Sequence, residues 1–513
     1  MKTNIIEHFE ETVATFPEKT AIIDGERHVT FRELRKKALA ISHALSNTEV
    51  SNRPIAVYLS KSAETVVADL GIIYSGNAFM NLDVSIPHER IRRILENVAP
   101  PLILTTRKLY DHIFKIRLKE QIILCMEEIL AQPDAMEESS NIVSCTADSK
   151  MFCIINTSGS TGTPKGVVLH QRGFLDYTRW AIDTFSLSHE EVLGVLSPVV
   201  FDHYVYEICL LFIHGVSLLL IPPSLSAFPV KILGLLKTHS VSFIFWVPTI
   251  MVNIANMKLF DEAVPPPLKT IWFAGEVFPT RQFNYWRAAF PTAIFVNLYG
   301  PTEITVDCTY YKIERELAND EPIPIGFPRK NVDILILNGS NELAKTGEEG
   351  ELCVLGSSLA LGYYNAPEKT AEVFVQNPLN GCYPEIIYRT GDIVYVNDYG
   401  EIVFKGRKDT LIKHQGYRIE LAEIEHAAIS AVAEVRNCCV FYRDKKIVLF
   451  YEARVTLDEK SLRLRLGETL PRYMLPTEYI HLSEMPRNVN GKIDRFTLKE
   501  TLPLHDRMHT PGR

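Results

Sequence analysis

Residues 151–166 read MFCIINTSGSTGTPKG, an apolar run followed by a loop of hydroxyl side chains and glycines that reaches Lys165. After a buried strand, such a loop presents N–H and O–H donors that suit the oxygens of a polyphosphate, and Lys165 adds positive charge. It is not a Walker A loop, because Pro164 precedes the lysine and Gly166 replaces the Ser or Thr that would hold magnesium. Composition alone also permits a solvated turn, but the ordered string is more specific than its composition.

Strand-like and helix-like segments alternate on both sides of this loop. Strand patterns at 54–59 and 78–83 alternate with helix patterns at 63–74 and 89–98, and a similar rhythm runs over 192–274. The alternation predicts an α/β class: a large N-terminal domain with largely parallel sheets covered by helices.

After about residue 400 the pattern changes to a small α+β unit, with a helix pattern over 421–432 and a hairpin pattern over 438–453. We therefore expect two domains, a large N-terminal core over 1–407 and a small C-terminal domain over 408–513. The segment 407–410 lacks Pro, Gly and Ser enrichment, which predicts a short hinge rather than a long linker.

Composition excludes several classes of protein. The chain has 513 residues, 46% of them hydrophobic and 23% charged, with a net charge of −8 and no dense basic run. This argues against a nucleic-acid binder. Nine scattered cysteines without a Cys/His cluster indicate neither a disulfide framework nor a zinc site. With no signal peptide and no apolar run long enough to cross a bilayer, we expect a soluble, cytoplasmic protein without a membrane partner.

Further motifs follow the loop in a fixed order. They are YGPTE at 299–303, YRTGD at 388–392, GRKD at 406–409, GYR at 416–418 and NGKIDR at 490–495. With the loop, they make nearly the whole chain resemble the adenylate-forming superfamily. That superfamily includes acyl-CoA synthetases, nonribosomal peptide synthetase adenylation domains, D-alanine–carrier protein ligases and luciferases. The resemblance implies ATP and Mg²⁺ as cofactors.

The resemblance also assigns nucleotide contacts. Tyr299 would stack on adenine, Thr302 would contact the α-phosphate, and Glu303 would offer Mg²⁺ a hard carboxylate oxygen. An ionised Asp392 can accept from both vicinal hydroxyls of a ribose. The remaining assigned residues are Thr157, Ser158, Gly159, Ser160, Thr161, Gly162 and Lys165 in the loop, Asn297 and Gly275 beside the base, and Arg407 and Arg418 as ribose or phosphate contacts. A surface salt bridge is the alternative for each arginine.

Lys492 is the predicted catalytic lysine, with Thr302 and Arg407 assisting. Asn490-Gly491 builds a tight turn that presents Lys492 at its tip. By resemblance, its ammonium bridges the substrate carboxylate and the α-phosphate as they react. The resemblance also implies that residues 1–407 are the adenylation core and that the C-terminal domain, 408–513, is mobile. It would turn about Asp409, the predicted hinge, between two half-reactions.

Asp202 indicates the kind of acid that is activated. On local grounds it could be only a helix N-cap. In amino-acid-activating relatives, however, the aligned Asp binds the α-ammonium, and a buried carboxylate needs such a partner. The other matched pocket positions are His203, Tyr206, Phe245, Trp272, Ala274, Leu298, Val306 and Asp307. The large rings leave little volume, so the side chain of the substrate should be small. The Asp307 carboxylate would accept a hydrogen bond from a hydroxyl or amine on that side chain.

These features predict activation of a small amino acid, serine foremost, to aminoacyl-AMP, and then transfer to a carrier protein. Because the sequence shows no phosphopantetheine-attachment motif, we expect a separate phosphopantetheinylated carrier as acceptor. D-alanine–carrier protein ligase stays open as an alternative, while ornithine or arginine would need more room. Two further functions stay open: an acyl-CoA synthetase, against which Asp202 argues, and a catalytically idle binding homologue.

Overall fold

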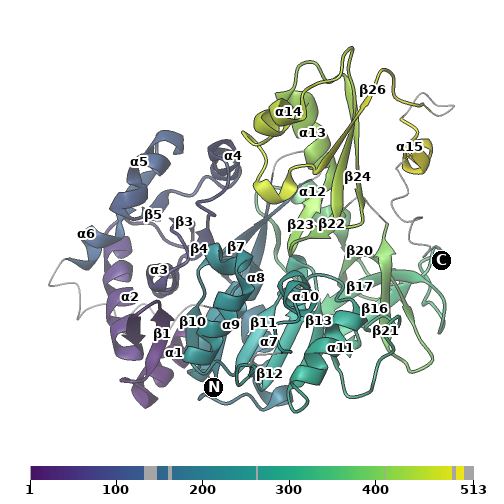
Figure 1. Cartoon of the computed structure of the whole chain (residues 1–513). Coiled ribbons are helices and arrows are strands. Elements are labelled where there is room, and N and C mark those ends of the chain that lie inside the picture. Colours follow the sequence, from purple (N-terminus) through teal and green to yellow (C-terminus); the bar gives the residue numbers. More distant parts are fainter. Residues whose placement is uncertain are drawn as a thin grey trace.

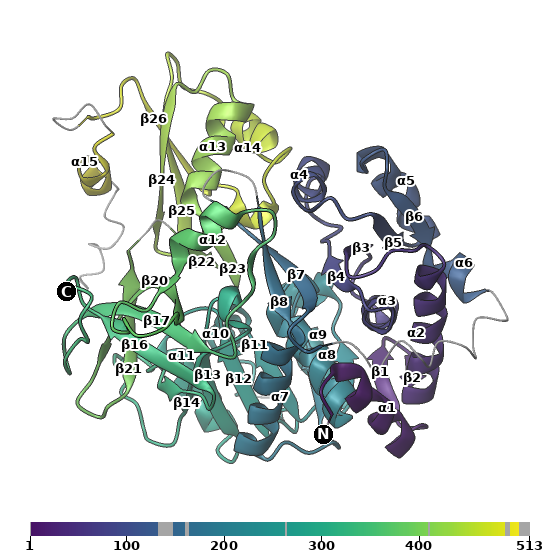
Figure 2. The ribbon, with the colours of Figure 1, turned by 180° about the vertical axis from the view of Figure 1, so that it is seen from behind.

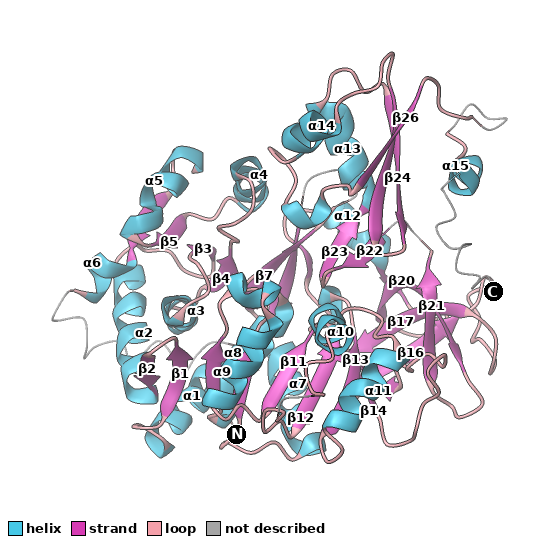
Figure 3. Ribbon diagram, viewed as in Figure 1, coloured by secondary structure: helices cyan, strands magenta, loops and turns pink. Residues whose placement is uncertain are grey.

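The computed structural model describes residues 2–131, 147–159, 164–261, 264–408, 411–487 and 493–501. It confirms the predicted α/β class with a smaller C-terminal α+β part (Figures 1 and 3). None of the helices in these ranges has the length and apolar character that a bilayer crossing requires.

A seven-stranded sheet carries the loop that follows residue 157. Its order is β18 (Gly362–Tyr363), β8 (Lys165–His170), β7 (Met151–Thr157), β4 (Ala78–Asn81), β3 (Pro54–Tyr58), β5 (Leu102–Thr105) and β6 (Ile122–Cys125). The pairs from β7 to β6 are parallel, as the alternation predicted. The intervening helices are α2 (Phe31–Ser46), α3 (Ala63–Tyr74), α4 (His88–Val98), α5 (Arg107–Ile116) and α6 (Met126–Leu130).

A nine-stranded sheet supplies most of the candidate site. Its order is β15 (Phe327–Pro328), β14 (Thr309–Lys312), β13 (Ile294–Tyr299), β12 (Thr270–Ala274), β11 (Phe243–Trp246), β9 (Val192–Val195), β10 (Ser217–Leu220), β1 (Thr20–Asp24) and β2 (Arg27–Thr30). Its helices are α1 (Ile5–Thr15), α7 (Gln171–Phe185), α8 (Asp202–His214), α9 (Pro229–Thr238), α10 (Pro248–Asn256) and α11 (Thr280–Ala289). One apolar core includes residues of both large sheets and of α1, α2, α3, α7 and α8.

A third sheet was not expected from the sequence. It contains β16 (Val332–Leu337), β17 (Gly350–Gly356), β19 (Phe374–Gln376), β20 (Ile386–Val396) and β21 (Ile402–Arg407), with α12 (Pro367–Val373) beside it. Its antiparallel ladder places Asp392 directly opposite Arg407. Two residues that belong to separate sequence motifs are thus neighbours by strand register.

The C-terminal part has its own apolar core. It begins with the hairpin β22 (Leu411–His414) and β23 (Tyr417–Glu420) and continues through α13 (Leu421–Ala431), β24 (Asn437–Arg443), β25 (Lys446–Glu452), α14 (Glu459–Leu466) and α15 (Arg495–Thr501). The unexpected β26 (Glu478–Leu482) pairs with β25 in parallel. Figures 1 and 2 both place α13 and α14 beside α4 of the large part. The domain boundary at 407/408 stays a prediction.

Candidate active site

The predicted amino-acid pocket lies where parallel strands of the nine-stranded sheet end. In open α/β sheets, ligands bind outside the carboxyl ends of the strands. Phe245 of β11 pairs with Trp272 of β12, and Ala274 of β12 pairs with Leu298 of β13. Gly275, the next residue after β12, has φ +90°, a value that favours glycine.

Four rings of the predicted pocket form one buried cluster. Asp202, His203 and Tyr206 occupy the first two turns of α8. The His203 ring lies 4.5 Å from Phe245, and Tyr206 stacks on Trp272 at 6.0 Å. Each of the nine assigned pocket residues is at most 9% exposed. The structure therefore brings these residues together, as their assignment to one pocket required.

Several polar atoms in this cluster have no hydrogen-bond partner among the described residues. They are His203 Nε2, Tyr206 Oη, Trp272 Nε1 and Asp307 Oδ1. Leaving a buried donor or acceptor unpaired costs about 1–3 kcal/mol, so native proteins seldom keep several in one place. A bound polar molecule would supply partners.

The His203 imidazole contacts Asp202 and lies within electrostatic reach of Asp307 and Glu207. Asp202 Oδ1 accepts from the His203 backbone N–H at 2.9 Å and lies 3.1 Å from His203 Nδ1. Burial alone would lower the pKa of His203, but the hydrogen bond and charge of Asp202, with the charge of Asp307, raise it. Burial raises the pKa of Asp307 to about 6, although the charge of His203 acts against this.

Glu303 is a fully buried carboxylate with a cationic partner. Arg418 Nη1 donates to its Oε2 at 2.6 Å, and the Tyr363 hydroxyl donates to its Oε1 at 2.7 Å. Burial would raise the pKa of Glu303, but Arg418 and Lys165 outweigh it and hold the pKa at about 2. Glu303 is therefore ionised at any physiological pH.

A permanently ionised Glu303 fits the role of a magnesium ligand, because Mg²⁺ is usually held by one or two carboxylates together with waters and phosphates. No cluster of three or more His, Cys, Asp or Glu side chains suited to a metal occurs in the part of the chain that the structure describes. A dedicated all-protein cage is not needed by that ion.

Asp392, the predicted ribose ligand, is engaged on both oxygens. The Tyr299 hydroxyl donates to Oδ2, and Arg407 pairs with Oδ1 and also donates to the Thr390 carbonyl at 3.0 Å. Asn297 Nδ2 donates to the Pro324 carbonyl at 2.7 Å. Tyr299, Asp392 and Arg407 thus form one cluster, and Glu303 lies close to it, because the charges of both Glu303 and Arg407 act on Tyr388.

The phosphate loop is described only in part. The Ser158 hydroxyl donates to the Arg418 carbonyl at 2.8 Å and accepts from the Glu420 N–H at 3.1 Å. Lys165 lies 4.9 Å from the Tyr363 ring centroid. The described residues do not include Ser160, Thr161, Gly162, the predicted hinge residue Asp409 and the predicted catalytic residue Lys492.

The β22–β23 hairpin reaches into this site from the C-terminal part. The Gly416 N–H donates to Glu276 Oε1 at 2.8 Å, and the Tyr417 ring contacts Phe201 at 5.0 Å. Lys413 lies over the Tyr299 ring at 5.4 Å. Sequence reasoning missed Lys413, although hairpin register places it directly opposite Arg418 and so on the same face.

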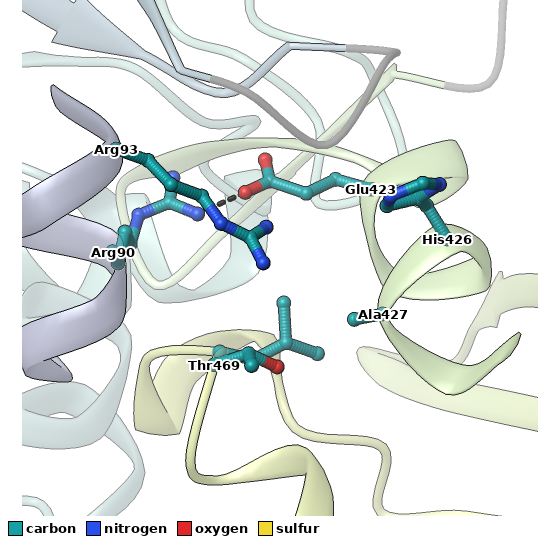
Figure 4. Close-up of a pocket in the computed structure, with 7 residues that line it drawn as sticks. Arg90, Arg93, Glu423, His426, Ala427 and Thr469 are labelled. Atoms are coloured by element: carbon teal, nitrogen blue, oxygen red, sulfur yellow. Dashed lines mark hydrogen bonds and ion pairs between the residues drawn. The ribbon is translucent and has the colours of Figure 1, made fainter. Parts of the chain in front are cut away.

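A second contact between the large part and the C-terminal part involves α4 and α13. Arg90 of α4 forms a buried ion pair with Glu423 of α13, and Figure 4 shows the two side chains pointing toward one another. The hairpin and this ion pair together hold the C-terminal part in one orientation over the site.

Comparisons with known proteins agree with this architecture. The model of the family described as AMP-binding enzyme matches residues 9–364. The chain is 32% identical to a delta-poly-L-ornithine synthetase of Acinetobacter baumannii (strain AB307-0294) over 96% of its length, and it spans 36% of that protein. It is 30% identical to a D-alanine–D-alanyl carrier protein ligase of Bacillus cereus (strain AH187), covering 96% of the chain and 98% of the relative.

A solved structure extends the comparison to the whole fold. The Vibrio cholerae adenylation domain AlmE, crystallised with glycyl-adenosine-5'-phosphate, superposes with a TM-score of 0.84 at 20% identity, over 98% of each chain. At this identity the likeness concerns the fold alone.

Proposed function

This chain belongs to the AMP-binding enzyme family, and we propose that it uses ATP to convert a small amino acid to its aminoacyl-AMP. Pyrophosphate is released in this step, and the aminoacyl group then passes to the phosphopantetheine thiol of a separate carrier protein while AMP leaves. The observation that carries the proposal is a buried aromatic cluster with two carboxylates, Asp202 and Asp307. Lys413 links this cluster to Asp392, because the charges of both Asp307 and Asp392 act on its ammonium.

Asp202 binds the α-ammonium of the substrate in this proposal. The residue is 6% exposed, and its carboxylate contacts His203. A second cation close to Asp202 would offset the burial of its charge. Fatty and aryl acids have no ammonium to supply, so the pocket favours an amino acid.

Asp307 selects the substrate side chain. Its Oδ1 has no partner among the described residues and can accept from a hydroxyl. The surrounding rings leave little volume, so L-serine is the foremost candidate. D-Alanine is the second candidate, because the chain matches a D-alanine–D-alanyl carrier protein ligase over almost its full length. An apolar methyl group would leave Asp307 Oδ1 unpaired.

Glu303 and Asp392 bind the nucleotide in the first half-reaction. Mg²⁺ held by Glu303 would neutralise phosphate charge, and Asp392 would accept from the ribose hydroxyls. In this structure Arg418 donates to the Glu303 carboxylate, which would otherwise be available to Mg²⁺. The orientation of the C-terminal part seen here therefore suits the second half-reaction better than the first. Rotation about Asp409 would then bring Lys492 to the site for the first.

The direct test is amino-acid-dependent ATP–pyrophosphate exchange across a panel of L- and D-amino acids. We expect the strongest exchange with L-serine, and at least a hundredfold loss in Asp202→Ala. The matched control is Asp183→Ala, which changes an exposed aspartate of α7. Exchange with D-alanine alone would favour the second candidate, and thioester formation on coenzyme A would identify an acyl-CoA synthetase. Absence of exchange with every amino acid would exclude the proposal.

Lys492→Ala separates the two half-reactions. We expect it to abolish aminoacyl-AMP formation and to leave transfer from pre-formed aminoacyl-AMP largely intact. Asp409→Pro, which fixes φ at the pivot, should instead let aminoacyl-AMP accumulate without loading the carrier. Equal loss of both steps in both variants would indicate a single static site.

A further inference from the structure

Two residues outside the predicted pocket donate hydrogen bonds to Asp307, one to its side-chain carboxylate and one to its main-chain carbonyl. The Tyr177 hydroxyl of α7 donates to Asp307 Oδ2 at 2.9 Å. Arg329 Nε donates to the Asp307 main-chain carbonyl at 3.0 Å. Tyr177 is 0% exposed and Arg329 1%, so water cannot replace either donor.

Tyr177 is itself fixed by its surroundings. Its ring meets Tyr206 edge-on at 4.8 Å, and the Arg329 guanidinium lies over it at 5.4 Å. Asp176, its neighbour on α7, pairs with Arg329 Nη1 at 2.6 Å. These contacts hold the ring in the position from which its hydroxyl donates to Asp307.

The two oxygens of Asp307 are therefore unequal. Oδ2 has the Tyr177 hydroxyl, whereas Oδ1 is buried without a partner among the described side chains. A carboxylate held by one oxygen presents the other in a defined direction. That is the arrangement a pocket needs to recognise one hydroxyl on a small ligand.

We propose that Tyr177 is a positioning residue: by donating to Asp307 Oδ2 it aims Oδ1 at the side-chain hydroxyl of a small amino-acid substrate. The inference rests on the proposed function and adds a residue to it. Arg329 supports the same geometry from the main chain. Tyr177 acts through Asp307 and does not touch the reacting atoms.

The charges around Asp307 give this role a distinct signature. The titratable and charged groups that face Asp307 are Tyr177, His203, Asp202, Lys413, Tyr206, Cys308 and Arg329. The Tyr177 hydrogen bond favours the ionised carboxylate and lowers its pKa against burial. Loss of that bond would raise the pKa of Asp307, so recognition of the hydroxyl would need a higher pH.

The test is Tyr177→Phe, which removes the hydroxyl and keeps the ring. We measure kcat/KM for L-serine and L-alanine by pyrophosphate exchange between about pH 5.5 and 8.5, a range that brackets the Asp307 titration. We expect the serine-to-alanine ratio to fall about tenfold, with alanine activity retained, since a hydrogen bond to a charged group contributes on this scale. The pH at which the ratio is half-maximal should move upward.

A double-mutant cycle with Asp307→Asn tests whether Tyr177 acts through Asp307. We expect Tyr177→Phe to change the ratio far less when Asp307 is already Asn. The matched control is Tyr204→Phe, which removes an equally buried hydroxyl-to-carboxylate bond of 2.9 Å, to Asp69 in the core. That control should leave the ratio unchanged.

If Tyr177→Phe unfolds at a lower temperature than Tyr204→Phe, Arg329→Lys gives a second route. It keeps a cation for Asp176 but loses the Nε donor to the Asp307 carbonyl, and the ratio should again fall. An equal loss for serine and alanine, with no pH shift, would overturn the inference and leave the proposed function standing. Absence of wild-type exchange with any amino acid would overturn both.

Discussion

At the scale of single residues, Asp307 brings a carboxylate into the interior and moves its titration toward neutral pH. Its pKa is raised by burial from an ordinary 3.8 to about 6. The folded state therefore binds more protons than the unfolded state between these two values. The stability that the protein loses through Asp307 grows as pH rises from about 4 to above 6.

Asp307→Asn should consequently stabilise the protein more at alkaline than at acidic pH. We expect its gain in apparent free energy of unfolding over wild type to be about 1 kcal/mol larger at pH 8 than at pH 5. Urea unfolding at the two pH values measures this difference. Asp333→Asn, at an exposed position, is the control, and an equal gain at both pH values would contradict the shifted pKa.

The contribution of Lys165 to ATP binding can also be tested by a single substitution. Burial and the charge of Arg418 lower its pKa, while Glu303 favours its charged form. Lys165→Ala removes a cation next to the predicted phosphate site, so KM for ATP should rise about tenfold. Lys150→Ala, at an exposed position before β7, should not change it. If KM for ATP were unchanged in Lys165→Ala as well as in the control, the loop would be a turn with no role in phosphate binding.

At the scale of elements, the β22–β23 hairpin depends on Gly416. Its φ is +81°, and a Cβ there would lie 2.8 Å from Val247 Cγ1 of the large part. The contact is closer than real Cβ atoms make, so a side chain would push the hairpin out of the site. Arg418, Lys413 and the Gly416 N–H reach the site through this hairpin.

Gly416→Ala should therefore impair the half-reaction that needs the hairpin. We expect carrier loading to fall at least tenfold while pyrophosphate exchange changes less than twofold. Gly400→Ala is the matched control, because Gly400 has φ +75° but a Cβ there would meet no described atom within 4 Å. Loss of exchange in Gly416→Ala would mean that the hairpin serves the first half-reaction.

At the scale of the whole molecule, the orientation of the C-terminal part rests on buried charge pairs. Arg418 reaches Glu303, and Arg90 reaches Glu423, whose side chain is 3% exposed. Removing one member of a buried pair is strongly destabilising, because the other charge stays buried without compensation. That penalty applies only to the orientation in which the pair forms.

Arg90→Ala should shift the molecule away from this orientation. We expect slower carrier loading with pyrophosphate exchange retained, and a longer mean distance between spin labels placed on α5 and α14. Arg92→Ala is the control, because Arg92 pairs with Glu96 within α4 and is 58% exposed. An unchanged distance distribution in Arg90→Ala would show that the ion pair does not set the orientation.

The sequence alone was enough for the class of fold and for the family. The periodicity of the apolar residues indicated the fold, and the order of the motifs indicated the family. The helix patterns at 63–74 and 89–98 appear as α3 and α4, and the run at 151–155 begins β7. Motifs are local strings, so their residues could be assigned by number before any contact was known. The roles assigned to the site residues remain predictions, and Lys492, Asp409 and the loop residues 160–162 also lie outside the described residues.

Tertiary structure decided what lies next to these residues. The opposition of Asp392 and Arg407 follows from strand register, and β26 joins its sheet from a distant segment. Tyr177 and Asp307 are 130 positions apart, and Arg90 and Glu423 are 333 apart. No local pattern encodes such pairs, because a side chain's partner depends on how separate elements pack. The charge states of Asp307 and Glu303 follow the same rule, since each pKa is set by burial and by neighbours that only folding assembles.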